Sequence, residues 1–136
     1  MEIKQLYEKL ENIKWLDKEI EELKLEIESL DSGVYKRSYP SASPLQKSSN
    51  NNAENKIVSI IKLKEDLEER LEKVINERLE SVRMIDKNPY ALERTVLRLY
   101  YVNALSIWDV VEKMDRSAPT IYRILRKAIA RLAKIL

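Results

Sequence analysis

The sequence has no cysteine, no histidine and only one glycine, Gly33. The absence of cysteine and histidine excludes disulfides, the usual zinc sites, thiol nucleophiles and histidine acid–base catalysis. One glycine and four prolines provide little of the turn chemistry that a sheet protein needs, so we expect an all-α fold. The acidic residues lie on predicted solvated helical faces, with no glycine-rich loop to organise them. We therefore expect no enzymatic activity, no metal and no cofactor.

Long apolar runs are also missing. No stretch approaches the ~18 consecutive apolar residues of a membrane span. The first residues, Met1-Glu2-Ile3-Lys4, have neither the basic region nor the apolar region of a signal peptide. These absences predict a soluble intracellular protein that does not act at a membrane.

Charge is unevenly distributed along the chain. The formal net charge is +2, but residues 89–136 contain nine Lys and Arg against four Asp and Glu, a local charge of +5. The first 88 residues carry a charge of −3. A basic C-terminal part on an acidic remainder indicates a polyanionic partner for the C-terminal part alone.

Two stretches have the apolar periodicity of long amphipathic helices. The first has apolar residues at steps of three and four: Ile3, Leu6, Leu10, Ile13, Leu16, Ile20, Leu23, Ile27 and Leu30. The second has Ile57, Ile60, Leu67, Leu71, Val74, Val82 and Ile85, with Lys64 and Arg78 interrupting the stripe. A helix over residues 3–30 is ~40 Å long, so it needs a partner helix. Residues 1–87 therefore predict a long antiparallel helical hairpin that resembles a coiled coil, or pairing between chains into a homodimer.

Residues 31–55 separate the two stretches and have no helical periodicity. Asp31-Ser32-Gly33 is suited to end the first helix, and the prolines, serines and asparagines that follow predict a flexible loop. Tyr35-Lys36-Arg37 and Tyr39 form a basic and aromatic group in this loop that is able to touch phosphate. A solvated linker is the favoured interpretation.

Residues 88–136 predict a second domain, made of shorter helices. Asn88-Pro89 ends the preceding helix, because the residue before a proline is disfavoured in the α region. A helix over residues 90–103 is expected next. Its predicted inward residues are Leu92, Val96, Leu99 and Tyr100.

The last 31 residues predict a helix-turn-helix. Ser106 to Asp109 is a capping box of the S-x-x-D form, placed before a short helix over residues 107–114. Asp115-Arg116 turns the chain. A longer helix over residues 117–134 then begins at Ser117 with Pro119 in its first turn, where a missing N–H costs nothing. A short helix, a tight turn and a longer basic helix are the layout that places a helix in the major groove of DNA.

The exposed side chains of this motif have chemistry suited to double-stranded DNA. The hydroxyls of Ser117 and Thr120 fit phosphate oxygens, and Arg123 is placed to bind guanine O6 and N7. The expected DNA-binding residues are Ser106, Arg116, Ser117, Ala118, Thr120, Tyr122, Arg123, Arg126, Lys127 and Arg131. The competing interpretation is a basic helix that only complements its own dipole and stays solvated. The order of cap, turn and basic face favours DNA.

The same residues resemble a known family. The matching elements are Glu93-Arg94-x-Val96-Leu97-x-Leu99-x-Tyr101, Leu105-Ser106-x-Trp108, Ser117-x-x-Thr120-Ile121-Tyr122-Arg123 and Ala128-x-x-x-Leu132. They resemble region 4 of sigma factors and, more closely, the ArpU- and RinA-like late activators of phages and prophages in Gram-positive bacteria. The resemblance implies a regulator of phage or prophage promoters in the cytoplasm of a bacterial host cell, with host RNA polymerase as a second candidate partner.

The chain departs from this family at the turns and at the start of the last helix. It has Ala104 where the family usually has glycine, and Asp115 where glycine is frequent. Aspartate tolerates the left-handed conformation better than most residues. Ala118 and Pro119 stand where sigma factors have polar or charged base-reading side chains. The sigma −35 element is therefore not the expected target, and Arg123 remains the strongest candidate base reader.

Two other functions remain open. A small terminase-like DNA-packaging subunit also joins a helix-turn-helix to oligomerising helices, and a ring-shaped oligomer would favour it. A structural coiled-coil interaction protein would bind no DNA, even at low salt where non-specific binding is strongest.

Overall fold

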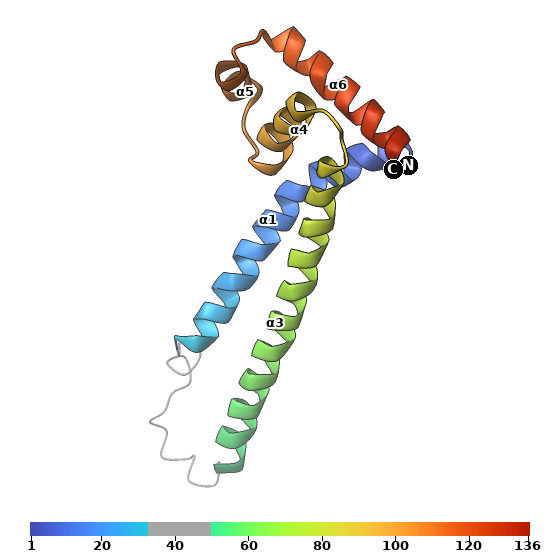
Figure 1. The fold of residues 1–136 in the computed structure, drawn as a ribbon. Coiled ribbons are helices and arrows are strands. Elements are labelled where there is room, and N and C mark those ends of the chain that lie inside the picture. Colours follow the sequence, from blue (N-terminus) through green and yellow to red (C-terminus); the bar gives the residue numbers. More distant parts are fainter. Residues whose placement is uncertain (33–49) are drawn as a thin grey trace. The chain divides into compact units, whose positions relative to one another are not determined.

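The computed structural model describes residues 1–32 and 50–136, and these residues form helices joined by turns, with no strand among them (Figure 1). The elements are α1 (Ile3–Asp31), α3 (Asn50–Asp86), α4 (Ala91–Leu97), the π-helix η2 (Arg98–Val102), α5 (Ile107–Met114) and α6 (Ala118–Ile135). The predicted all-α class is confirmed. Within the described residues, no helix is both long enough and apolar enough to cross a membrane.

The described chain divides into two compact units. The first unit consists of Met1–Lys18 and Asn76–Leu136, and the second unit consists of Glu19–Ile75. Each of the long helices α1 and α3 therefore contributes to both units. The beginning of α1 and the end of α3 are grouped with residues 88–136 because their apolar side chains belong to the same core.

The core of the first unit is one cluster of buried apolar side chains from every helix in that unit. Its members are Leu6, Leu10, Ile13, Ile85, Val96, Leu97, Tyr101, Val110, Ile121, Leu125, Ala128, Ile129, Leu132 and Ala133. The contribution of α1 follows from the three- and four-residue spacing of its apolar residues, which places them on one helical face. This core fixes the positions of α4, α5 and α6 relative to one another.

The second unit has fewer buried side chains and more ion pairs. Leu23, Leu30 and Val74 are its buried apolar residues in the described part of the chain. The Lys64 Nζ lies 2.7 Å from Asp31 Oδ1, and the Arg70 Nη2 lies 2.8 Å from Glu19 Oε1. The later residue of α1 pairs with the earlier residue of α3, so the two segments run antiparallel within this unit.

The charged residues that interrupt the apolar stripe of α3 have acidic partners on α1. Lys64 pairs with Asp31 in the second unit, and Arg78 pairs with Asp17 in the first unit. The hydrogen bond and the charge of Asp31 raise the pKa of Lys64 above its ordinary value. The charged residues that interrupt the apolar stripe are therefore positions where α1 and α3 form ion pairs.

The start of α3 corrects the predicted loop. The sequence predicts a loop that continues to residue 55, but α3 begins at Asn50. Residues 50–55 therefore belong to α3 and not to the loop. Of the rest of the predicted loop, Asp31 is the last residue of α1, and residues 33–49, including Tyr35-Lys36-Arg37, lie outside the described residues.

The helix predicted over residues 90–103 is also corrected. The structure has α4 followed by the π-helix η2, and the chain bends at Asn103. Val96 is buried as predicted, and Leu99 and Tyr100 are half-buried against the core. Leu92 is 38% exposed, and Leu97 and Tyr101 are buried although they were not predicted to be. The inward face of α4 starts at position 93, one residue later than predicted, because the Glu93 carboxylate is bound inside the unit.

Candidate nucleic-acid interface

Helix α5 begins where the capping box predicts. Ser106 is the N-cap, with extended backbone angles, and its Oγ accepts a hydrogen bond from the Asp109 backbone N–H at 3.2 Å. The helix ends at Met114, as predicted, because Asp115 takes the left-handed conformation with a φ of 52°. The boundaries of this short helix are therefore set by local chemistry at both ends.

Helix α6 also begins at a serine cap. The Ser117 Oγ accepts a hydrogen bond from the Thr120 backbone N–H at 3.4 Å and shares a second hydrogen bond with the Thr120 Oγ1 at 2.8 Å. Pro119 lies in the first turn, where its missing N–H leaves no intrahelical bond unmade. Both hydroxyls predicted to contact phosphate are thus held at the first turn of α6, and Ser117 is exposed.

The two faces of α6 have opposite character. Its buried residues are Ile121, Leu125, Ala128, Ile129, Leu132 and Ala133. The exposed residues of its first three turns include Tyr122, Arg123, Arg126 and Lys127. Because buried and exposed positions alternate at the helical period, the four exposed side chains form one solvated surface.

The cations of this surface have no side-chain partner in the part of the chain that the structure describes. Arg123, Arg126 and Lys127 are exposed, and so is Arg116 in the preceding turn. None of the four makes an ion pair or a side-chain hydrogen bond within residues 1–32 and 50–136. These four cations, which we call the basic surface, are therefore available to an external anion.

Arg131 differs from the other predicted DNA-binding residues. Its Nε lies 3.0 Å and 3.2 Å from the two carboxylate oxygens of Glu93, and its guanidinium lies 4.3 Å from the centre of the Tyr90 ring. This bifurcated contact, in which the two oxygens share one N–H donor, joins the last turns of α6 to the start of α4. The charge of Arg131 is thus paired within the first unit, whereas the charges of Arg123 and Lys127 are not paired within the described residues.

A buried polar junction at Asn88 was not predicted from the sequence. Asn88 is fully buried, and its Nδ2 donates to Glu93 Oε1 at 3.2 Å and to the Ala128 carbonyl at 3.5 Å. Its Oδ1 accepts from the Tyr90 N–H at 2.9 Å. The Asn-Pro pair was identified only as a helix end. The junction also locks α4 to α6, because every polar atom of the amide is satisfied there.

The two residues that stand where the resembled family has glycine lie at left-handed backbone positions. Ala104 has a φ of 53° and Asp115 a φ of 52°. After Ala104, the Leu105 N–H donates back to the Leu99 carbonyl at 3.1 Å, as in a glycine-terminated helix end. A left-handed alanine is strained by its Cβ, so the turn before α5 is held by the surrounding structure.

Of the ten predicted site residues, nine lie in or next to the two caps and the exposed face of α6. Ala118 and Thr120 are half-buried, and Arg131 is held by Glu93. Within the described residues, no group of acidic side chains is arranged to hold a metal ion.

One family model matches the chain. Its description is Protein of unknown function (DUF1492), and it matches residues 41–133, which include both helix caps and the basic surface. No curated protein and no solved structure matches the chain.

Proposed function

We propose that this chain, which belongs to the DUF1492 family of proteins of unknown function, is a transcription regulator that binds double-stranded DNA through α5 and α6. In this proposal α6 enters the major groove and the two serine caps face the phosphates on either side. Residues 88–136 resemble sigma region 4 and phage late activators. This resemblance supports the proposal that the bound DNA is a phage or prophage promoter.

The observation that carries the proposal is the basic surface. Arg116, Arg123, Arg126 and Lys127 extend from solvated positions around the start of α6, and no acidic side chain of the described chain neutralises them. Each cation that replaces a counterion at a phosphate contributes a slope of about 0.9 to the dependence of log K on log salt concentration. A polyanion such as DNA is the kind of partner that binds all four cations at once.

The residues have different roles in this proposal. Arg123 lies one turn into α6, at the position from which a guanidinium reaches the guanine edge. Arg116 and Lys127 flank it and bind phosphates, and Ser106 and Ser117 fix the helix starts against the backbone. Arg131 acts as a positioning residue, because its contact with Glu93 holds α6 in place.

Selection of bound fragments from random DNA tests the proposal first, because a recovered motif establishes both sequence specificity and its symmetry. On the recovered site, we expect Arg123→Ala to reduce the preference for one base pair. Lys127→Ala should weaken binding to all sequences equally and lower the salt dependence. Lys62→Ala is the matched control, because it removes one exposed cation from the second unit. No enriched motif and no salt-dependent binding would overturn the proposal.

A homodimer is the second part of the proposal. Ile57, Val58 and Ile61 are exposed apolar side chains on one stretch of α3 in the second unit. Pairing of this stretch with a second copy would remove them from water and place two helix-turn-helix motifs on one DNA site. A ring of many copies would instead favour the terminase-like alternative, and sedimentation equilibrium distinguishes these states. Host RNA polymerase remains a proposed contact of the DNA-bound protein.

A further inference from the structure

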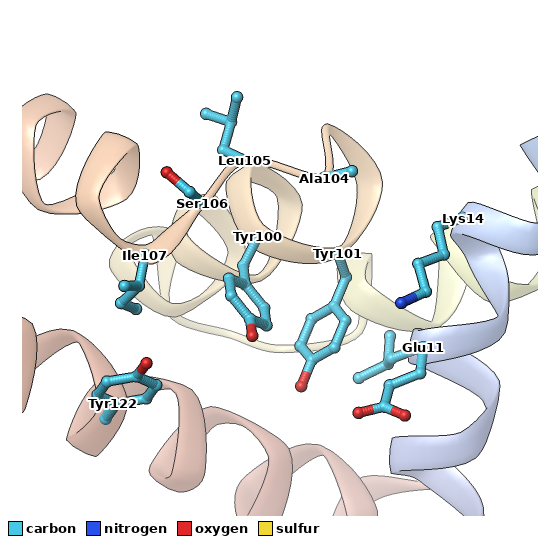
Figure 2. Close-up of a pocket in the computed structure, with 10 residues that line it drawn as sticks. Glu11, Lys14, Tyr100, Tyr101, Ala104, Leu105, Ser106, Ile107 and Tyr122 are labelled. Carbon is cyan, nitrogen blue, oxygen red and sulfur yellow. The ribbon is translucent and has the colours of Figure 1, made fainter.

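A pocket of about 340 Å³ lies within the first unit, beside the start of α1 and the turn between η2 and α5 (Figure 2). Its polar wall is formed by Glu11 and Lys14 of α1 and by three tyrosines, Tyr100, Tyr101 and Tyr122. Leu10, Leu105 and Ile107 supply apolar surface. Nothing in the proposed DNA contact uses this pocket.

Tyr101 supplies the most firmly positioned hydrogen-bond donor of the pocket. The side chain is only 8% exposed, and its ring packs edge-on against Tyr100 with 4.9 Å between centres. Its hydroxyl lies at the pocket that the labelled residues surround (Figure 2), and it makes no hydrogen bond within the described residues. Every buried side-chain polar atom of the described residues has a hydrogen-bond partner, so this unbonded hydroxyl is not enclosed but open to the pocket and accessible to a ligand.

The hydroxyl of Tyr101 is a donor at neutral pH. Burial, followed by the neighbouring Tyr7, Tyr100 and Glu11, raises the pKa of Tyr101 well above its ordinary value. The phenol therefore stays protonated and presents an O–H to the pocket. Its natural complement is an acceptor, and a carboxylate is the strongest acceptor among small biological groups.

The rim of the pocket carries both signs of charge. Glu11 and Lys14 are exposed, lie one turn apart on α1, and form no ion pair within the described residues. The Lys14 Nζ is instead 5.5 Å from the centre of the exposed Trp15 ring. An unpaired acid and an unpaired base at the same opening suit a ligand that is itself a zwitterion.

Both tyrosines on the η2 side belong to the π-helix. Tyr100 and Tyr101 lie within Arg98–Val102, and both line the pocket. Single π-helical turns are rare and frequently occur at functional sites.

We propose that the pocket binds a free amino acid with an apolar or aromatic side chain. The ligand's ammonium group faces Glu11, and its carboxylate accepts from Lys14 and from the Tyr101 hydroxyl. The side chain lies against Leu10 and the Tyr100 ring. The volume is at the lower end for ligand pockets, so one amino acid fits better than a nucleotide or a longer peptide.

The pocket is also placed to influence the proposed DNA site, a consequence that rests on the proposed function. Ser106, the cap of α5, and Tyr122, on the exposed face of α6, both line the pocket. A ligand that changes the position of either side chain changes DNA affinity, and DNA then changes ligand affinity by the same factor. Couplings of this kind are typically about 5- to 150-fold.

The binding test needs no DNA. The full chain is titrated with each of the standard amino acids, and binding is followed by calorimetry and by NMR of the tyrosine side chains. We expect binding by one or more apolar or aromatic amino acids, with the Tyr101 signals shifted. The amine and the acid analogues, each lacking one charged group, should bind at least about tenfold more weakly. No binding up to about 10 mM overturns the proposal, and so does equal binding of either analogue.

Two variants separate the pocket from general stability. Tyr101→Phe removes the hydroxyl and keeps the ring, and we expect about tenfold weaker ligand binding. Lys14→Gln removes the cation of the pocket with less effect on packing, and we expect weaker ligand binding there too. Its control is Lys18→Gln, because Lys18 is a cation on the same helix that contacts Trp15 and does not line the pocket. Circular dichroism melts confirm that all three variants fold. Unchanged affinity in both Tyr101→Phe and Lys14→Gln overturns the proposal.

A DNA titration with and without the amino acid then tests the coupling alone. A change in DNA affinity supports it, and an unchanged affinity overturns the coupling but not the pocket. A chain that binds the amino acid and no DNA contradicts the proposed function and leaves the pocket standing, so the two failures are distinguishable.

Discussion

The two compact units differ in what their charged side chains contact. In the second unit, Lys64 and Arg70 of α3 meet acidic residues of α1. In the first unit, the basic surface around the start of α6 meets no acidic side chain of the described chain, although Arg131 on the same helix is held by Glu93. Pairing charges inside the second unit joins its helices, whereas leaving them unpaired on α6 keeps them available to a partner.

The units also differ in how they are held together. The first unit has an apolar cluster drawn from every helix and a buried polar junction at Asn88, whereas the second unit has three buried apolar side chains and exposed ion pairs. Exposed pairs contribute little because water and salt screen them. We therefore expect substitutions in the first unit to cost more stability than equivalent substitutions in the second.

The largest difference is expected between two leucines of the same helix. Leu6 is fully buried in the first unit, whereas Leu23 keeps some exposure in the second. Leu6→Ala should lower the free energy of unfolding by about 3 kcal/mol, and Leu23→Ala by about half as much, because few other buried apolar side chains surround Leu23 in the second unit. Urea unfolding measures both, and equal losses would contradict the comparison.

The next difference concerns two arginines in ion pairs. Arg131→Met leaves the Glu93 carboxylate, which is mostly buried, with Asn88 as its remaining partner. We expect a loss of about 2 kcal/mol, reduced from the cost of a fully buried pair because Arg131 is partly exposed. Arg70→Met removes an exposed pair and should cost less than about 1 kcal/mol.

The same thermal or urea unfolding measurements compare the two arginine variants. If Arg70→Met proved more destabilising than Arg131→Met, the stability of the second unit would depend on its ion pairs more than the solvent exposure of those pairs indicates.

A substitution at Ala104 should have the opposite sign. Ala104→Gly relieves the left-handed strain before α5 and is expected to stabilise the chain by about 1 kcal/mol, less the greater freedom of glycine in the unfolded state. Asp115→Gly is the matched variant, with a smaller gain because aspartate tolerates the conformation. Destabilisation by Ala104→Gly in a melting experiment would show that the alanine methyl group makes a contact that outweighs the strain.

The smallest effects are expected at alkaline pH. The pKa of Tyr101 in the first unit and that of Lys64 in the second are both raised on folding, so each contribution is complete below the unfolded pKa and is lost as pH rises through the folded pKa. Stability should therefore decline above about pH 10. Tyr101→Phe should reduce this decline more than Lys64→Gln, because the lysine pair is exposed. Melting temperatures of both variants between pH 8 and 11 measure which one reduces the decline more. A larger reduction in Lys64→Gln would contradict the expectation.

Local signals in the sequence predicted both ends of α5 and the start of α6, whereas distant contacts decided which side chains are buried. The caps at Ser106 and Ser117 were predictable because a hydroxyl and the backbone N–H three residues later make the bond. The burial of Glu93 was not, because its partner Arg131 lies 38 residues further along the chain. The wrong inward assignment of Leu92 follows from that same pair.

The candidate site shows the same division. The exposed face of α6 follows from helical period alone, and Arg123 and Lys127 lie on it as predicted. The ion pair of Arg131 with Glu93 depends on how α6 packs against α4, and the pocket at Tyr101 depends on how α1 packs against its neighbours. The local sequence carries no signal for either packing.

The most direct test of the DNA-binding proposal is the salt dependence of DNA affinity for the full chain and for one triple variant. Arg123, Arg126 and Lys127 are all replaced by Gln, with Lys62→Gln as the control for loss of a cation from the second unit. The proposal predicts that the slope of log K against log salt falls by about 2 to 3 in the triple variant and stays unchanged in the control. Equal slopes for the unmodified chain and the triple variant would contradict it.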